Sequence, residues 1–477
     1  MSTEVAALDG SRAGVGDDAL ETLATGLRGA VVTPSDPGYA AVRPEFNAMH
    51  DGEPALALSC SGTADVVDAV NFAREHGLKV AVRGGGHSVA GLSSIDGGML
   101  IDLSPMRGVQ ADPERRLALV QGGALWGDVD RETQAFGLVA PGGVVSDTGV
   151  AGLTLGGGYG WVRRKYGLSC DHLIEAQVVT ADGRVLTASE ESHPDLYWAL
   201  RGGGGNFGIV TSFTFDLQPL GPLVGFAAVM YPIEEVQEVM TGWRDFVGDA
   251  PNEITSVVVT ITFPANPDMP EAVHDRPVAI VGGVHAGGDA EAGLQAMAPL
   301  RELGTVLFDM SGPTPFTGVQ TGFDPLFPRN QLQSYWKSQY LDELSDDAIG
   351  TIASKAKDRP APLTLVNTFA MGGAINDVDP EATAFAERSA PYMVSIDGMW
   401  TDPSENEANV GWVRSAWDGV REFGNGSVYL NFTGLADESA DAGVDTAFGR
   451  NLRRLAEIKG EYDPDNFFRV NNNIRPA

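Results

Sequence analysis

The feature that most constrains this chain is the density of glycine between residues 80 and 170. Short apolar runs there alternate with glycine-rich runs, which read RGGGHSVAG at 83–91, APGGVVSDTG at 140–149 and LGGGYG at 155–160. Glycine has no Cβ atom and adopts positive φ angles, so its backbone can lie against a flat or anionic ligand. Consecutive glycines also present successive N–H groups, which form an anion-binding nest. The stretch therefore predicts the floor of a large ligand site, with His87 at the mouth of its first glycine run.

The pattern of apolar residues predicts an α+β protein. At 477 residues the chain exceeds the size of a single hydrophobic core, so two domains are expected. Strands at 55–59 and 78–82 are predicted to flank a helix at 64–76, a unit that delivers the chain to residues 83–91. Beyond residues 219–222 the pattern predicts an antiparallel sheet with helices on one face, with strands at 227–231, 255–263, 278–284, 363–371 and 427–432 and helices at 233–247, 290–303, 346–356, 380–390, 406–423 and 444–459.

The charge of the chain excludes one class of partner. Its formal net charge is −32, from 64 Asp and Glu against 32 Lys and Arg. Such a surface repels nucleic acid, whose binding depends on Lys and Arg that neutralise phosphates. Two explanations of the charge remain open. One is a high-salt cytoplasm, where salt screens the self-repulsion, and the other is a GC-rich genome that favours Asp and Arg over Lys.

The sequence carries no pattern of export or membrane insertion. It has no run of about 18 apolar residues. The N-terminus lacks the basic start and apolar core of a secretory signal. Two cysteines, Cys60 and Cys170, are too few for a disulfide framework. We therefore expect a cytoplasmic protein with no membrane partner.

A second glycine run, at 203–208, matches the letters of the GxGxxG dinucleotide fingerprint. That fingerprint requires a strand before it and a helix after it, so that the helix N-terminus meets the pyrophosphate. Here a β-like run at 209–215 follows the glycines. The context argues against a nicotinamide-binding Rossmann site.

Four motifs in a fixed order carry a family resemblance: RGGGHSVAG at 83–91, the long run 140–173, LYWALRGGGGNFGIVTSF at 196–213 and YDPDNFFRVNNNIRP at 462–476. Together they resemble the FAD-linked oxidases of the berberine-bridge-enzyme type, within the vanillyl-alcohol-oxidase (PCMH-type FAD-binding) superfamily. The resemblance covers nearly the whole chain. It implies a lead-in at 1–45, a PCMH-type FAD-binding domain at 46–220, a substrate domain at 221–440, and a segment at 441–477 that returns to the FAD-binding domain.

The resemblance also implies how FAD is held. His87 matches the histidine that bonds to a methyl group of the flavin's dimethylbenzene ring, and residues 83–88 would cradle the diphosphate. The implied cofactor-binding residues are Arg83, Gly84, Gly85, Gly86, His87, Ser88, Thr148, Gly149, Gly152, Gly156, Gly157, Gly158, Tyr159, Ile209, Val210, Asn471 and Asn473. A covalent alkyl link would withdraw electrons from the flavin and so raise its reduction potential. Such tuning of the cofactor is the protein's contribution, while the redox chemistry is the cofactor's own.

Two positions depart from the family pattern. Many relatives carry a second flavin link through cysteine at the position of Val145, and valine cannot form a thioether. Cys170 lies beyond that position, and we interpret it as a packed thiol rather than a second link. Plant relatives have a Tyr-x-Asn-Tyr motif whose second tyrosine is the base, whereas this chain has Phe432 there.

Tyr429 and Asn431 retain the rest of that motif and are the predicted catalytic residues. The missing base leaves Tyr429, Tyr335, Tyr340 or a carboxylate within 397–402 as candidates by residue type.

The implied activity is oxidation of a small organic molecule. A base takes a hydroxyl or amine proton while hydride passes to flavin N5, and dioxygen is the expected acceptor. Thr148 falls at the family's oxygen-gating position, so a flavin dehydrogenase with another acceptor stays open. A flavin-binding protein without turnover also stays open because of Phe432. The sequence does not choose among sugars, polyketides and alkaloids as substrates.

Overall fold

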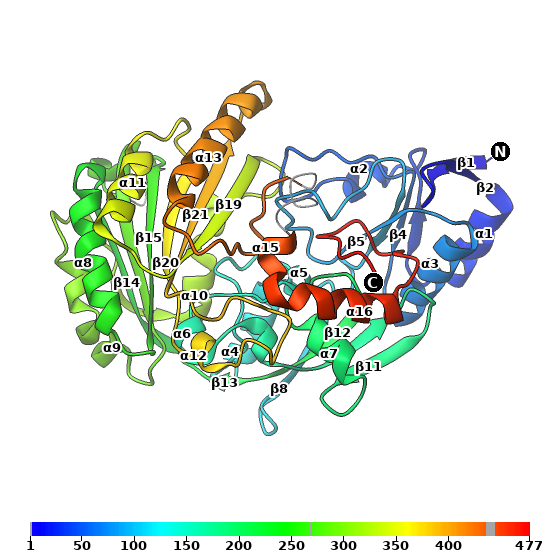
Figure 1. The fold of residues 1–477 in the computed structure, drawn as a ribbon, viewed down its shortest axis with the longest axis horizontal. Helices are drawn as coiled ribbons and strands as arrows, with labels where there is room; N and C mark the ends of the chain where they lie inside the picture. Colours follow the sequence, from blue (N-terminus) through cyan, green and yellow to red (C-terminus); the bar gives the residue numbers. More distant parts are fainter. Residues whose placement is uncertain (1, 268, 436–443) are drawn as a thin grey trace.

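The computed structural model describes residues 2–267, 269–435 and 444–477. Figure 1 shows an elongated molecule, with a large sheet and its helices at one end and the N-terminal elements at the other. The residues before position 46 form β1 (Ser2–Ala6), β2 (Arg12–Gly16), α1 (Asp17–Gly26), β3 (Ala30–Val32) and α2 (Tyr39–Val42). Strands β1 and β2 make a separate two-stranded hairpin, whereas β3 pairs with the strand that begins at Leu56 and so joins the first sheet.

The first sheet has the strand order β3-β4-β6-β5, and β4 (Leu56–Ser59), β5 (Val80–Arg83) and β6 (Met99–Asp102) are parallel. Helix α3 (Thr63–Glu75) connects β4 to β5. It buries Val66, Ala69, Val70 and Ala73, which lie on one face at helical spacing. This confirms the predicted strand–helix–strand unit, and it places the glycine run directly after β5.

The second sheet is antiparallel and has the order β11-β10-β12-β8-β7. Its strands are β7 (Val109–Asp112), β8 (Leu117–Gln121), β10 (Leu173–Val179), β11 (Val185–Ser189) and β12 (Ile209–Asp216). Helix α3 contacts strands of both sheets. The connecting elements are α4 (Trp126–Gln134), β9 (Leu138–Val139), α5 (Val150–Leu155), α6 (Arg163–Tyr166), α7 (Pro194–Leu200) and β13 (Gln218–Pro219).

The third sheet has eight strands in the order β17-β14-β16-β15-β20-β21-β19, with β18 paired to β14. The strands are β14 (Leu223–Pro232), β15 (Ile254–Phe263), β16 (Arg276–His285), β17 (Phe308–Asp309), β18 (Gly312–Pro315), β19 (Gln333–Leu341), β20 (Leu365–Ala370) and β21 (Tyr392–Trp400). Figure 1 shows α8 (Val236–Asp249), α11 (Asp346–Lys357) and α13 (Asn406–Arg421) on its outer face. The remaining helices of this part are α9 (Ala290–Ala296), α10 (Phe316–Thr321) and α12 (Ala374–Asp377).

Alternate residues of these strands point to opposite faces of the sheet. Val258, Val366 and Ile396 pack against the helices. Their neighbours Val257 and Leu365 belong to the core on the other face, which is turned toward the first two sheets. The fold is α+β, as predicted, and the long helices α8, α11 and α13 lie on the face of the third sheet opposite to the cavity.

Two predicted elements are absent, and two strands were missed. The predicted helix at 380–390 is irregular, because its side chains bind the glycine-rich half of the molecule instead of one another. The predicted strand at 427–432 is wrong: the segment is irregular and turns at its end, where Phe432 N donates to Tyr429 O. The strands β19 and β21 were not predicted, because polar residues interrupt their apolar pattern.

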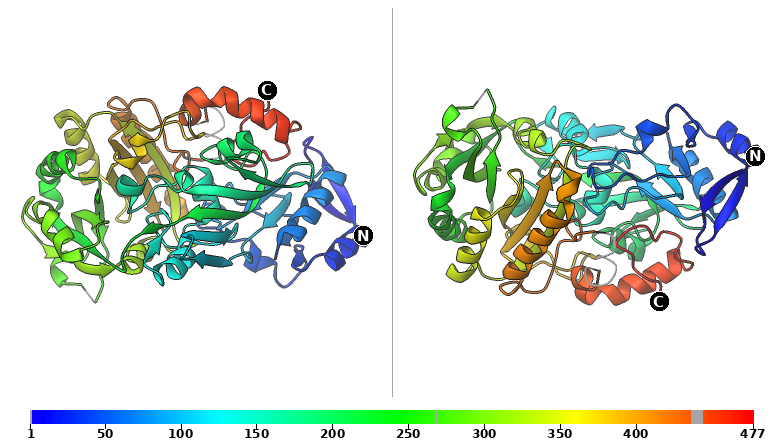
Figure 2. Two further views of the ribbon diagram at one scale, coloured as in Figure 1. Left: turned by 90° about the horizontal axis from the view of Figure 1, so that it is seen from below. Right: turned by 90° about the horizontal axis from the view of Figure 1, so that it is seen from above.

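The C-terminal segment returns to the N-terminal half, as both views in Figure 2 show. Helices α15 (Val444–Phe448) and α16 (Leu452–Tyr462) correspond to the helix predicted at 444–459, and α16 packs on α7. None of the helices within the described ranges is long and apolar enough to cross a membrane.

Candidate functional site

An elongated cavity runs from the glycine-rich loops to the inner face of the third sheet. Backbone glycines form one end: Gly84, Gly85, Gly86, Gly149, Gly152, Gly156, Gly204, Gly205 and Gly208. Aromatic and polar side chains form the other end: Tyr159, Trp161, Phe323, Phe327, Trp336, Asn367, Phe369, Asp397, Tyr429 and Phe432. One cavity therefore joins both parts of the molecule.

The glycine end requires glycine for two reasons. A Cβ on Gly85 would lie 2.3 Å from the Cα of Gly149, so these two loops touch through backbone alone. A Cβ on Gly152 or Gly205 would meet no atom of the described residues within 4 Å, and would instead project into open space. This wall leaves room for a ligand in direct contact with the backbone.

His87 lies in the wall with an unused ring nitrogen. Its ring stacks on Phe46 with 3.8 Å between centroids. Its Nε2 is buried and has no hydrogen-bond partner in the described part of the chain. Burial, helped by the charge of Arg329, lowers the pKa of His87 to about 3. The imidazole is therefore neutral at pH 7, which is the form with nucleophilic character.

A loop of the second domain holds this wall in place. Arg329 Nη2 donates to the carbonyl oxygens of Gly85 at 2.7 Å and of Asp147 at 2.9 Å. Its Nε also lies 2.6 Å from the Asp147 carboxylate. Asp324, on the same loop, accepts hydrogen bonds from the backbone and the hydroxyl of Ser146. The loop thus fixes the positions of His87 and its neighbours.

The C-terminal tail is fixed over the cavity by a buried ion pair. Lys459 Nζ lies 2.6 Å from Asp463 Oδ2 and donates to the carbonyl oxygen of Asn206 at 2.7 Å. Asn206 in turn donates to the carbonyl oxygen of Asn472 at 3.0 Å. Asn471 and Asn472 line the cavity, and their side-chain oxygens are buried without a partner among the residues described.

These features fit FAD, the cofactor that the resemblance implies. The glycine wall, the unpaired imidazole nitrogen and the unpaired amide oxygens all face one cavity, so a bound group would satisfy groups that otherwise stay unpaired.

Most of the residues predicted for the site line this cavity. They are Gly84, Gly85, Gly86, His87, Ser88, Thr148, Gly149, Gly152, Gly156, Tyr159, Ile209, Val210, Tyr429, Asn431 and Asn471. The cavity is also lined by Gly204, Gly205 and Gly208. Sequence reasoning assigned these glycines no role beyond a poor match to the GxGxxG fingerprint.

Four predicted residues, Arg83, Gly157, Gly158 and Asn473, do not line the cavity. The Arg83 guanidinium donates to three backbone carbonyl groups of neighbouring loops. A Cβ on Gly157 would lie 2.4 Å from the ring of Phe385, so this glycine accommodates the second domain instead of the ligand. Gly158 packs against adjacent side chains in the same way.

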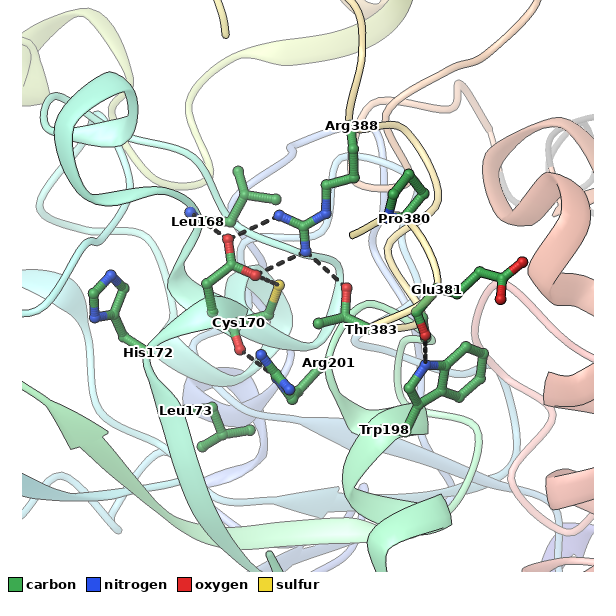
Figure 3. A network of polar contacts seen from close by, with 12 residues as sticks. Leu168, Cys170, His172, Leu173, Trp198, Arg201, Pro380, Glu381, Thr383 and Arg388 are labelled. Atoms are coloured by element: carbon green, nitrogen blue, oxygen red, sulfur yellow. Dashed lines mark hydrogen bonds and ion pairs between the residues drawn. The ribbon is translucent and has the colours of Figure 1, made fainter. Parts of the chain in front are cut away.

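Cys170 is buried outside the cavity wall, in the network of Figure 3. Arg201 donates to the Cys170 carbonyl oxygen at 2.9 Å, and Arg388 forms two hydrogen bonds to the carboxylate of Asp171. Burial raises the pKa of the Cys170 thiol to about 12, so it stays protonated and unreactive. This supports its interpretation as a packed thiol, whereas Val145 lines the cavity.

Asp397 lines the cavity from β21, between the edge strand β19 and β20 of the third sheet. Trp336 and Leu365 lie directly beside it on the adjacent strands. Its carboxyl oxygens accept hydrogen bonds from Ser395 Oγ and, at 2.6 Å, from Asn367 Nδ2. Burial outweighs both hydrogen bonds and raises the pKa of Asp397 to about 7. The carboxyl can therefore exchange a proton near neutral pH, which is what a general base requires.

Sequence reasoning placed Asp397 only within a range of candidate carboxylates and did not find Asn367. Of the other candidate bases, Tyr335 packs on the helical face of the sheet, and Tyr340 does not line the cavity. Period-two alternation in 392–400 could have indicated that Asp397 shares a face with the buried Met393 and Met399.

The retained part of the family motif forms a hydrogen-bonded pair. Asn431 Nδ2 donates to Tyr429 Oη at 2.9 Å. Burial raises the pKa of the Tyr429 hydroxyl, which therefore stays protonated at neutral pH. The Phe432 ring lies 5.1 Å from that of Tyr429 and has no proton acceptor. Phe432 thus keeps an aromatic ring at this position of the cavity wall, but it cannot act as the base that the family motif has there.

Comparisons with known proteins identify the family. A family model described as an FAD binding domain matches residues 54–189, and one described as berberine and berberine like matches 428–475. The uncharacterized FAD-linked oxidoreductase YgaK of Bacillus subtilis is 32% identical over 459 residues, which cover 95% of this chain and 98% of the relative. The (R)-6-hydroxynicotine oxidase of Paenarthrobacter nicotinovorans is 29% identical, over 94% of this chain and 97% of the relative.

The same fold occurs in solved structures. The 6-hydroxy-D-nicotine oxidase from Arthrobacter nicotinovorans matches with a TM-score of 0.82 and 26% identity, over 94% of this chain and 98% of that chain. With its glycine wall, its buried His87 and its returning C-terminal segment, this chain belongs to the berberine-bridge-enzyme-like family of FAD-linked oxidoreductases.

Proposed function

We propose that the protein oxidises a small organic molecule at the aromatic end of the cavity and passes the electrons through FAD to dioxygen. The observation that carries the proposal is a carboxyl with a pKa near neutral, Asp397, in the same cavity as the neutral His87. The first residue can accept a proton from a substrate, and the second can hold the cofactor. A relative of similar length is named as an oxidase of a small heterocyclic amine.

We infer that residues 46–220 and 441–477 bind FAD and that 221–440 bind substrate. The residues predicted for the cofactor that line the cavity would contact FAD, with His87 bonded covalently to it. A single covalent link is expected, because Val145 cannot form a thioether and Cys170 is protonated and outside the wall. Both cysteines are free thiols, which fits a cytoplasmic location.

The residues of the aromatic end then have distinct roles. Bound FAD supplies the hydride acceptor, and its reoxidation by dioxygen yields hydrogen peroxide. Asp397 accepts the substrate proton at its carboxylate, which Asn367 and Ser395 hold in place. The Tyr429 hydroxyl, which burial keeps protonated, donates a hydrogen bond to the substrate or to FAD. Asn431 orients this hydroxyl by donating to its oxygen. The surrounding rings exclude water and position the substrate carbon.

Mass spectrometry of the acid-denatured protein tests the cofactor half of the proposal. We expect the mass to exceed that of the chain by one FAD, and we expect the His87→Ala variant to lose this excess. An unmodified wild-type mass with yellow supernatant would overturn the covalent link and leave FAD binding intact. A link that persists in the variant would implicate Cys170.

Anaerobic mixing of the holoenzyme with alcohols, amines and sugars tests the catalytic half. We expect at least one class to bleach the flavin absorption, and we expect air to restore it with release of hydrogen peroxide. Bleaching without peroxide would indicate a dehydrogenase that uses another acceptor. A flavin that no class bleaches would favour a binding protein without turnover.

A further inference from the structure

We infer that the aromatic end of the cavity binds an organic ammonium ion, that is, a protonated amine with an apolar or aromatic body, in preference to a sugar or a neutral alcohol. The inference rests on the proposed function in one respect, which is that this end of the cavity receives the substrate. Three observations support it: hydrogen-bond acceptors that face the ligand, an aromatic wall, and too few polar side chains to pair with the hydroxyl groups of a sugar.

Two adjacent polar side chains at this end of the pocket, Asp397 and Asn367, direct acceptors at a ligand. Asn367 Nδ2 donates to Asp397 Oδ2 at 2.6 Å, and because a carboxylate cannot donate in return, this contact fixes which way the amide points. The other end of the amide, Asn367 Oδ1, is buried and has no partner within the described ranges. A carboxylate and an unpaired amide oxygen on adjacent strands require hydrogen-bond donors from a ligand. A primary or secondary ammonium ion carries at least two N–H donors, one for each acceptor, whereas the hydroxyl of an alcohol carries one.

Aromatic rings surround these acceptors. Trp336 lies directly across from Asp397 on β19, and the Phe432 ring is 5.2 Å from the Trp336 ring. The Tyr159 and Phe369 rings lie 5.2 Å apart, and the Arg163 guanidinium already lies over both, at 5.7 Å and 5.4 Å from their centroids, so Trp336 and Phe432 are the rings left for a ligand cation. The faces of such rings carry negative potential and attract cations, most strongly when the site is closed to water.

The Asp397 carboxyl also lacks a basic partner among the described residues, which leaves its charge available to a ligand cation. Within the described residues, hydrogen bonds from Ser395 and Asn367 are the influences that oppose the burial of Asp397, and no basic side chain is among them. Arg163 reaches the wall, but its guanidinium donates to the backbone carbonyls of Gly160, Ser256 and Ala370. It is thus committed to the protein and does not pair with Asp397.

A sugar would find too few partners here. The polar side chains that line this end are Arg163, Asn367, Asp397, Asn431 and Thr433, besides the Tyr159 and Tyr429 hydroxyls and the Trp336 indole N–H. Val257, Val259 and Leu365 cover the rest of the sheet face. Hydroxyl groups buried against such a surface without partners lose their hydrogen bonds to water and weaken binding. The net charge of −32 would in addition raise the local concentration of cations.

The same arrangement prepares the ligand for oxidation. The ammonium N–H bond breaks, its proton passes to the Asp397 carboxylate, and the electron pair of that bond stays on nitrogen. The products of this step are a neutral carboxyl group and a neutral amine. Two-electron oxidation at the neighbouring carbon requires a free lone pair on nitrogen. Asp397 would therefore both bind the ammonium ion and deprotonate it.

Binding to the holoenzyme tests the inference without turnover. The probes are N-methylbenzylamine, which is protonated at pH 8, benzyl alcohol as its neutral counterpart, and glucose. Quenching of tryptophan fluorescence reports binding, because Trp161 and Trp336 line the pocket. We expect the ammonium to bind about tenfold or more tightly than the alcohol, with glucose weakest, as a buried charge pair contributes at least ~1.5 kcal/mol.

The Asp397→Asn variant should bind both benzyl ligands with similar affinity. Asp130→Asn is the matched control, because Asp130 is equally buried, has a pKa likewise raised to about 7, and does not line the cavity. It should keep the wild-type preference. If the alcohol or glucose binds as tightly as the ammonium in the wild type, the inference is wrong, and no variant is needed for that conclusion.

The proposed function is judged separately by flavin bleaching in the same samples. Bleaching by an alcohol with no preference for the ammonium would overturn the inference and leave the oxidoreductase intact. A clear ammonium preference without bleaching by any ligand would support the inference and count against turnover. Loss of the preference in Asp130→Asn as well would show that it does not originate at Asp397.

Discussion

The Asp397 carboxyl is expected to govern how turnover depends on pH. It must be ionised to accept a proton, and its pKa is raised to about 7 by burial. We therefore expect kcat/KM to fall as the pH drops below about 7, since protonation removes the base. Asp397→Asn should lower kcat/KM by about 10²–10⁴-fold and remove this limb of the profile, as for loss of a general base. A substrate that does not titrate between pH 5 and 8 makes the measurement clear.

Asp130→Asn is the control for this prediction too. It removes a buried carboxyl with a similarly raised pKa, one that accepts a hydrogen bond from Gln320 at 2.8 Å. The control should keep the acidic limb at its wild-type position. An acidic limb that survives in Asp397→Asn would assign the base to another group.

Single residues of the site differed in how far sequence could identify them. His87 and the glycines beside it occur in one contiguous motif, and the structure places them in one wall. The burial of Asp397 depends on its neighbours in the sheet, Trp336 and Leu365, which lie far from it in sequence. Its desolvation, and hence its raised pKa, is a product of strand register, which a candidate list by residue type does not contain.

At the scale of elements, helix α16 holds the tail over the cofactor site through the Lys459–Asp463 pair. Both side chains are fully buried. Removing one partner leaves the other charge buried and uncompensated, which costs about 3–5 kcal/mol. We expect Lys459→Met to lower the free energy of unfolding by about that amount and to loosen the segment beside Asn206. Guanidinium unfolding measures the first effect, and hydrogen exchange in 463–474 measures the second.

The same helix offers a matched comparison. Arg453 forms an exposed ion pair with Glu457, with 91% of the Arg453 side chain accessible to solvent. Arg453→Met should change stability little, because solvent screens such pairs. Equal effects of the two variants would show that the buried pair does not anchor the tail.

Helices with regular apolar spacing were predicted well, whereas the strand and the loop segment that carry polar or charged residues of the cavity and its surroundings were not. The helices predicted at 346–356 and 406–423 correspond closely to α11 and α13, which pack by their apolar faces. Strand β21 has Ser395, Asp397 and Gly398 at its centre, residues that weaken a strand pattern. Polar residues placed for a site break the local rules from which strands are predicted. The irregular segment 380–390 likewise takes its shape from Arg388 and Phe385, which bind the other half of the molecule.

At the scale of the whole molecule, the net charge of −32 produces a repulsion that salt should relieve. The Debye length falls from about 30 Å at 0.01 M salt to about 3 Å at 1 M, so distant carboxylates stop interacting over this range. We expect the Tm of the holoenzyme to rise by several degrees between these concentrations of NaCl. A double variant, Glu21→Lys with Glu343→Lys, removes two exposed negative charges and adds two positive ones, and it should show a smaller rise. A Tm that does not respond to salt would contradict adaptation to a high-salt cytoplasm and leave genome composition as the explanation of the charge. A rise that continues beyond 1 M, where screening is already complete, would instead favour that adaptation.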